Sequence, residues 1–240
     1  MCIFGKKMPK PALLLLVLVF GFFSASTAMA TSLGACAAMT VGPTPGNTVF
    51  PTDCSGDSPG TLLAFMSEPF SYTTTSGTNS GFIYSAVYND GGTLDFLYQV
   101  TSDMSSSTAL NRETDTDFAG FTTNTAFMSD GGDILTGTSF VDASTPPISS
   151  DSNADGSVIG FTFSPPISGE IQPGTPSDIL VIATNATNYM VGNASIIDGG
   201  TDTVNAFAPT AATPEPATLA LLGFGLIGLA AWRRRRVSES

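Results

Sequence analysis

The stretch "GFIYSAVYNDGGTLDFLYQV", residues 81–100, decides the fold class. Two runs rich in aromatic and β-branched residues flank the turn Asp90-Gly91-Gly92. Asp-Gly pairs supply the positive φ angles that tight hairpins need, so the stretch predicts a β-hairpin. In its second run apolar and polar residues alternate, which predicts a strand with Asp95 and Gln99 on one face and four apolar side chains on the other: Leu94, Phe96, Tyr98 and Val100.

Short runs of the same composition continue along the chain, separated by Gly, Asn and Asp. Further strands are expected at residues 61–67, 117–127, 133–141, 157–163, 178–184, 193–198 and 203–207. Two more hairpin turns are expected, at Asp130-Gly131-Gly132 and at Asp198-Gly199-Gly200. No segment of this part has the periodicity of an amphipathic helix. The pattern predicts an all-β protein in which residues 61–213 form a single β-sandwich, after an irregular lead-in over residues 31–60.

The N-terminus has the three parts of a secretory signal peptide. Lysines at positions 6, 7 and 10 precede the apolar run 12–23, and small residues end in Ala28-Met29-Ala30. Residues 1–30 are therefore predicted to be removed by cleavage between Ala30 and Thr31. An uncleaved membrane anchor is the alternative.

Charge is distributed very unevenly. Apart from three lysines near the N-terminus and four arginines near the C-terminus, Arg112 is the only basic residue, against 19 of the 20 acids in residues 31–216. A net charge near −18 excludes nucleic acid as an expected partner, because phosphate contacts require Lys and Arg. Such a charge suits divalent cations or cationic surfaces, or it serves solubility alone.

Cysteine usage agrees with export. Cys36 and Cys54 are the two cysteines that follow the signal peptide, and they are 18 positions apart. In an oxidising compartment they are expected to form a disulfide, which would stabilise the fold by roughly 3 kcal/mol. The competing interpretation takes residues 33–36 as a lipobox, with Cys36 lipidated.

Several catalytic chemistries are excluded by composition. The chain has no histidine, and residues 31–216 have no lysine, so Ser-His-Asp triads, histidine-ligated zinc and Schiff bases are absent. A carboxylate pair remains conceivable, with Asp95 and Glu113 beside aromatic strands. Because Trp232 is the single tryptophan and lies in the tail, the expectation is a protein that is not an enzyme.

One segment resembles part of a calcium loop. In "DSNADGSVI", residues 151–159, oxygen-bearing Asp151, Asn153 and Asp155 alternate before a glycine. The twelfth position is Thr162 rather than Glu, and the following residues are typical of a strand. A weak calcium site and a simple polar turn are therefore both open, and no other cofactor is expected.

The C-terminal tail is built for a membrane. Residues 217–232 carry no charge and would form a helix about 24 Å long, slightly short of a bilayer core of about 30 Å. The cluster Arg233, Arg234, Arg235 and Arg236 follows it and is expected to stay cytoplasmic. Pro214, Glu215 and Pro216 stand before it as a stiff, extended peptide.

These three parts, in this order over residues 214–240, resemble the PEP-CTERM sorting signal of Gram-negative bacteria. The resemblance implies that an exosortase recognises the Pro-Glu-Pro motif and cleaves nearby. It also implies export across the inner membrane, transient anchoring through the C-terminal helix, and a final place at the cell surface or outside. A plain single-pass anchor is the alternative.

Stretches of residues 61–213 also resemble a recurrent exported PEP-CTERM type that has no assigned activity. The family is associated with bacteria that make exopolysaccharide and biofilm matrix. The resemblance therefore implies a non-catalytic envelope or extracellular-matrix protein with a structural or adhesive role, with exopolysaccharide as a partner. A calcium-assisted carbohydrate-binding module is the alternative, and a polysaccharide hydrolase is the third.

Overall fold

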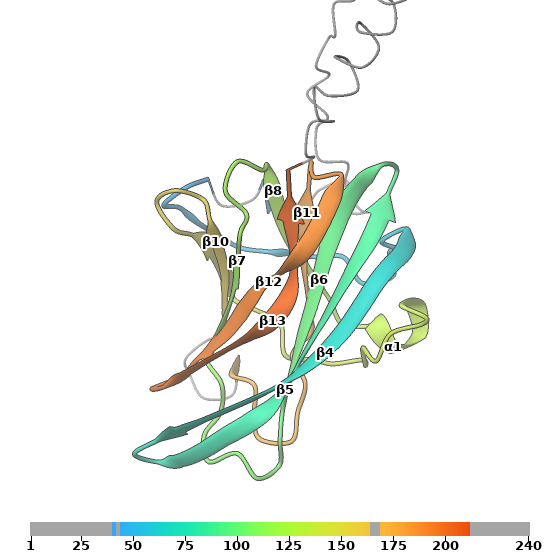
Figure 1. Ribbon diagram of the computed structural model, residues 1–240. Coiled ribbons are helices and arrows are strands. Elements are labelled where there is room, and N and C mark those ends of the chain that lie inside the picture. The colour runs from blue at the N-terminus through green and yellow to red at the C-terminus, as the bar shows by residue number, and fades with distance from the viewer. Residues whose placement is uncertain (1–39, 42–43, 164–168, 212–240) are drawn as a thin grey trace, which may run out of the picture.

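The computed structural model describes residues 40–41, 44–163 and 169–211, which form two packed β-sheets (Figure 1). Sheet A has the order β1 (Thr40–Val41), β8 (Thr123–Met128), β11 (Ile179–Thr184), β6 (Thr93–Ser102), β5 (Gly77–Asp90) and β4 (Thr61–Thr74), with β3 (Thr52–Asp53) parallel to β8. Sheet B has the order β13 (Thr201–Thr210), β12 (Asn188–Ile197), β7 (Arg112–Thr116), β10 (Val158–Thr162), β9 (Ser149–Ser152) and β2 (Thr48–Val49). The β-sandwich prediction is confirmed.

The predicted signal peptide, the C-terminal helix 217–232 and the arginine cluster lie outside the described residues. Within the described part, no helix has the length and apolarity that a membrane crossing requires. Its helix α1 (Gly131–Ile134) is a single turn of four residues.

The decisive hairpin forms as the sequence predicts. β5 and β6 pair in antiparallel register from Gly81 opposite Ser102 to Asp90 opposite Thr93. Gly91 and Gly92 adopt φ angles of 62° and 106°, which glycine reaches without the steric cost that a Cβ would bring. The hairpin places β6 in the middle of sheet A, between β5 and β11.

The main core lies between the two sheets. Every second side chain of β6 points into it, as the alternation of residues 93–100 predicts, and β10 and β12 contribute from the other side. Its largest fully buried side chains include Phe96, Tyr98, Phe118, Phe161 and Phe163.

A second core lies on the outer face of sheet A. Leu97, Val181 and their neighbours on this face are covered by residues 129–148, a segment that includes α1 and is called the cover here. The cover contributes Leu135 and Phe140, and Cys54 of the lead-in joins the same cluster. All residues of β6 except Thr101, and all residues of β11, are consequently buried.

The cover contradicts two predictions from the sequence. The strand expected at residues 133–141 is absent, because these residues form the end of α1 and a loop over the sheet. The hairpin turn expected at Asp130-Gly131-Gly132 is wrong as well, since Gly131 begins α1. A Cβ on Gly131 would overlap the Ile179 side chain, so glycine serves close approach here rather than a turn.

Side-chain amides and carboxylates fasten the cover to sheet A. Gln99 of β6 donates to the carbonyl of Val141 at 2.8 Å and accepts from its N–H at 3.0 Å, as a strand backbone would. Asp178 accepts from the Thr145 N–H at 2.8 Å. The polar face of β6 that the sequence predicts is therefore used for internal attachment.

The free edge of β13 is closed by sheet A. The Phe207 N–H donates to Ser85 Oγ at 3.0 Å, and the Tyr98 hydroxyl donates to the Phe207 carbonyl at 2.5 Å. Farther along, the N–H of Ser71 on β4 donates to Asp202 Oδ2 at 2.7 Å. Edge groups that could pair with another chain are thereby occupied at this side of the sandwich.

Other differences concern short strands. The lead-in 31–60 is less irregular than predicted, because β1, β2 and β3 fall within it as two-residue strands. Cys54 is buried in the second core, while Cys36 lies outside the described residues. The disulfide, the lipidation alternative and the cleavage between Ala30 and Thr31 therefore stay predictions.

Candidate functional site

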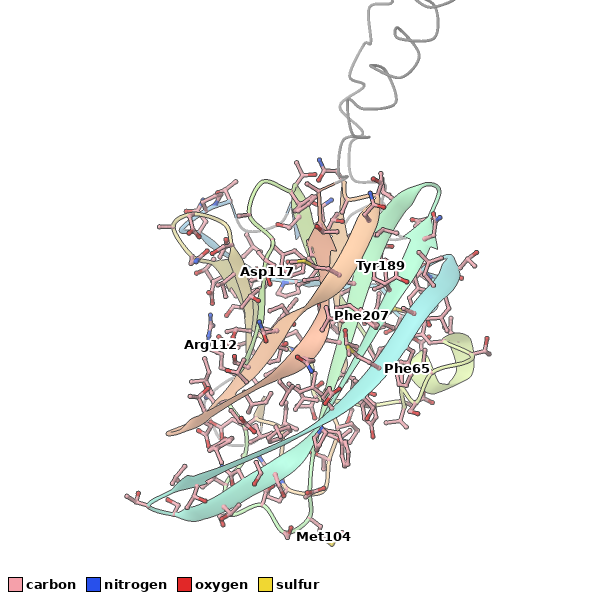
Figure 2. The ribbon with its side chains drawn as sticks, viewed as in Figure 1. Phe65, Met104, Arg112, Asp117, Tyr189 and Phe207 are labelled. Atoms are coloured by element: carbon pink, nitrogen blue, oxygen red, sulfur yellow. The ribbon has the colours of Figure 1, made fainter. Side chains whose placement is uncertain are left out.

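The strand β7, "RETDT", carries one basic and two acidic side chains, of which Figure 2 labels Arg112. Arg112 and Thr116 point outward from sheet B, whereas Glu113 and Asp115 point into the core between the sheets and are 0% and 1% exposed. Neighbouring side chains of one strand point to opposite faces, so β7 carries an ion pair on one side and an acid pair on the other.

Arg112 makes the outward ion pair with Asp151 of β9. Its Nη1 and Nη2 atoms donate to the two carboxylate oxygens at 2.6 and 2.7 Å, and Nη1 also donates to Thr162 Oγ1 at 2.8 Å. A Cβ on Gly160, in the strand between them, would overlap Arg112 Nη2. Glycine at this position therefore lets the guanidinium cross β10, and hydrogen bonding to Asp151 raises the pKa of Arg112.

Glu113 and Asp115 form a carboxyl pair within the core. Burial raises the pKa of both, and the side chains lie within hydrogen-bonding reach of each other. No other hydrogen-bond donor reaches their oxygens within the described part of the chain. Burial and the proximity of a second carboxyl group both favour a proton on this pair.

Asp95 is a further buried carboxyl group, on the outer face of sheet A beneath the cover. Burial raises its pKa to about 8, and the charge of Asp90 adds to this shift. Its cross-strand neighbour Tyr88 is likewise desolvated, with its pKa raised to about 12. Asp95 and Glu113, the two acids expected beside aromatic strands, thus lie in different layers and do not meet.

Each of the three residues of the calcium hypothesis has a hydrogen-bond partner within the protein. Both oxygens of Asp151 are held by Arg112, Asn153 accepts from the Val158 N–H at 3.0 Å, and Asp155 accepts from the Ser157 N–H at 3.0 Å. Within residues 40–41, 44–163 and 169–211, no three acidic or cysteine side chains are arranged to hold a metal ion. The local geometry is that of a polar turn between β9 and β10.

The acids of the candidate site differ in their exposure to solvent. The buried acids cannot be reached from solvent, and Asp151 is neutralised by Arg112. Asp115 was missed by sequence reasoning, although the alternation in "RETDT" places it on the same face as Glu113. The strand β7 was not recognised in the sequence because its residues are polar.

The C-terminal end supplies the clearest functional signal. β13 ends at Thr210, and a family model described as the PEP-CTERM protein-sorting motif matches residues 212–236. The chain carries a PEP-CTERM sorting signal. The matched range contains Pro214, Glu215 and Pro216 as well as all four arginines of the cluster, which confirms the resemblance. Neither curated proteins nor solved structures give a match to the chain.

A PEP-CTERM signal implies export and processing by an exosortase at the membrane. In this chain the signal begins directly after the last strand of the sandwich. The working domain and the sorting signal are therefore consecutive, with almost no linker between β13 and the motif.

Proposed function

We propose that this protein is a non-catalytic component of the cell envelope or extracellular matrix, delivered by its PEP-CTERM signal and processed by an exosortase. Its β-sandwich then has a structural or adhesive role at the cell surface or beyond it, in contact with exopolysaccharide. The observation that carries the proposal is the sorting motif at residues 212–236, immediately after β13.

The open face of sheet B supports an adhesive role. Cross-strand register aligns polar side chains on its outer side: Asn193 opposite Asn205, and Ser195 opposite Thr203. Ser195 and Thr203 hydroxyls also lie 2.8 Å apart. A row of amides and hydroxyls offers donors and acceptors to the hydroxyl groups of a polysaccharide without requiring charge.

The non-catalytic part of the proposal is supported by the burial of the acids that lie on or beside aromatic strands. A glycosidase needs two accessible carboxyl groups on either side of the scissile bond. Glu113 and Asp115 are enclosed by both sheets, and Asp95 is enclosed by sheet A and its covering layer. A hydrolysis screen on exopolysaccharide that detected turnover by the purified protein would refute this part of the proposal.

The sorting role is tested by two changes in a host that carries the exosortase. Glu215→Ala removes the proposed recognition element, so the full-length protein should accumulate in the membrane fraction. Neutral replacement of Arg233 to Arg236 removes the stop-transfer charges, each of which costs roughly 2.5–3.5 kcal/mol at the bilayer centre, so uncleaved protein should leave the membrane.

Fractionation and mass measurement distinguish these outcomes. Glu68→Ala, a glutamate change in the sandwich, is the matched control and should be processed like the parent. Trimming of Glu215→Ala at the parental rate would leave the tail as a simple anchor and overturn the sorting proposal.

A further inference from the structure

An apolar corner stands exposed at the start of β12. Tyr189, Met190 and Val191 are consecutive and are 37%, 39% and 56% exposed. Tyr189 packs edge-on against Phe207 of β13, with ring centroids 5.5 Å apart and an interplanar angle of 89°. Figure 2 shows the two rings together on neighbouring strands. Tyr189 and Val191 lie on the same face of sheet B as Phe207, whereas Met190, the residue between them, points to the opposite face. Three neighbouring apolar side chains form a patch, unlike scattered single exposed residues, and such patches mark contact sites.

The corner lies where the chain leaves the sandwich. Tyr189 pairs with Pro209, and its neighbour Asn188 pairs with Thr210, the last residue of β13. Seven Cα–Cα steps, through the six residues 211–216, connect Thr210 to Ala217, where the apolar run of the tail begins. Even fully extended, they reach at most about 25 Å. A tail inserted in a bilayer therefore keeps this corner close to the lipid surface.

The chemistry of the corner suits the interface between lipid and water. Residues 188–191 and 207–210 carry no charge, whereas the exported part as a whole is strongly acidic. Tyrosine is enriched at membrane interfaces because its ring is apolar and its hydroxyl is polar. The carboxylate of Asp117 lies against Gly192 and marks the limit of the uncharged patch.

We propose that Tyr189 and Val191 rest in the headgroup layer of the bilayer that holds the tail. This inference depends on the membrane anchoring in the proposed function. The patch is small, so its own affinity for lipid is weak, but the short tether gives it a high effective concentration at the membrane. The contact holds the sandwich in one orientation beside the Pro-Glu-Pro motif, and it is lost when cleavage removes the tether.

Fluorescence of the full chain in lipid vesicles tests the contact. Trp232→Phe removes the single native tryptophan, and Tyr189→Trp then places a reporter in the corner. Met104→Trp is the matched control, since Met104 is 87% exposed at the opposite end of the sandwich (Figure 2). In phosphatidylcholine vesicles with brominated acyl chains, the Tyr189→Trp chain should lose emission and shift to shorter wavelength. The Met104→Trp chain should do neither.

Each other outcome overturns a defined part. Flotation without quenching in either chain refutes the docking and leaves the anchor intact, whereas a chain that does not float refutes the anchor and the docking together. Equal quenching of both reporters means non-specific adsorption and refutes the role of the corner. Absence of quenching together with slow processing of a Tyr189→Ser, Val191→Ser chain assigns the corner to the processing enzyme instead of lipid.

Discussion

The outer faces of the two sheets differ in how far they are covered. On sheet A, β6 and β11 are buried on both sides because the covering residues 129–148 pack over them. On sheet B, the described residues form no comparable layer, and β12 keeps the exposed outer side chains of a half-buried strand. The comparison shows that alternation in a sequence identifies the two sides of a strand, while a distant segment decides whether the second side meets water.

The same difference decides the charge of the acids. Asp95 lies under the covering layer and its pKa is raised, whereas Asp151 lies on the open face of sheet B and is paired with Arg112. Burial between the sheets likewise raises the pKa of Glu113 and Asp115. Burial without a cation favours the protonated form of a carboxyl group, so the layer around each acid sets its state.

Removal of an anchor of the covering layer should have the largest effect. Phe140 is 4% exposed and packs edge-on against Phe65 at 5.8 Å. Phe140→Ala should therefore lower the free energy of unfolding by about 3–5 kcal/mol. Val191→Ala on the open face of sheet B is the control and should change it by less than about 0.5 kcal/mol. Urea unfolding measures both, and equal values would mean that the covering layer contributes nothing.

The buried acids should make the protein more stable in acid than in alkali. The pKa of Asp95 is raised from an unfolded value near 4 to about 8, so the folded state binds its proton more tightly. The stabilisation is complete below about pH 4 and is lost as the pH rises toward about 8. Each unit of pKa difference corresponds to about 1.4 kcal/mol. Thermal unfolding between pH 4 and pH 8 measures the trend.

Neutral variants assign that trend to particular residues. Asp95→Asn should raise stability at pH 8, with little gain at pH 4, because the amide never ionises. Glu113→Gln should act in the same direction for the pair between the sheets. A parent protein that becomes more stable from pH 4 to pH 8 would contradict the assignment.

The ion pair of the open face should have the smallest effect. Arg112 and Asp151 side chains are 27% and 29% exposed, so solvent screens part of their attraction. Gly160→Ala should displace the guanidinium and cost about 1–2 kcal/mol, consistent with loss of charge-assisted hydrogen bonds. In an Arg112→Ala background the same change should cost much less. Equal costs in both backgrounds, measured by urea unfolding, would show that Gly160 acts independently of Arg112.

The sequence predicted the fold class because its long strands carry clear signals. β5, β6, β10 and β11 fall on the expected runs, and the turns at Gly91 and Gly199 have the positive φ that Asp-Gly suggested. β7 and β9 were missed, since "RETDT" and "SSDS" lack the apolar residues by which strands are recognised. The run 133–141 was predicted to be a strand because it contains apolar residues. These residues do pack into a core, but they belong to the cover over sheet A.

Only part of the candidate site could be predicted from the sequence. The sorting motif was readable because its order of parts is local and specific. The carboxyl pair was not, because "RETDT" was not recognised as a strand and because the enclosure of Glu113 and Asp115 depends on sheet B packing over sheet A. Likewise, the bidentate ion pair between Arg112 and Asp151 depends on the register in which β7 and β9 pair with β10. No local sequence pattern encodes that register.

The closed edge of β13 has a mechanical consequence. The chain leaves this strand at Thr210, so a force applied through the tail acts on the end of β13, and its component along the strand axis loads the strand lengthwise. Ten residues of β13 pair with ten of β12. On the other side of β13, Ser85 and Tyr98 form hydrogen bonds with the Phe207 backbone. Load along this axis must shear all these bonds together instead of opening them one by one. The terminal strand is thus built as a tension-bearing link between the sandwich and whatever holds its C-terminus.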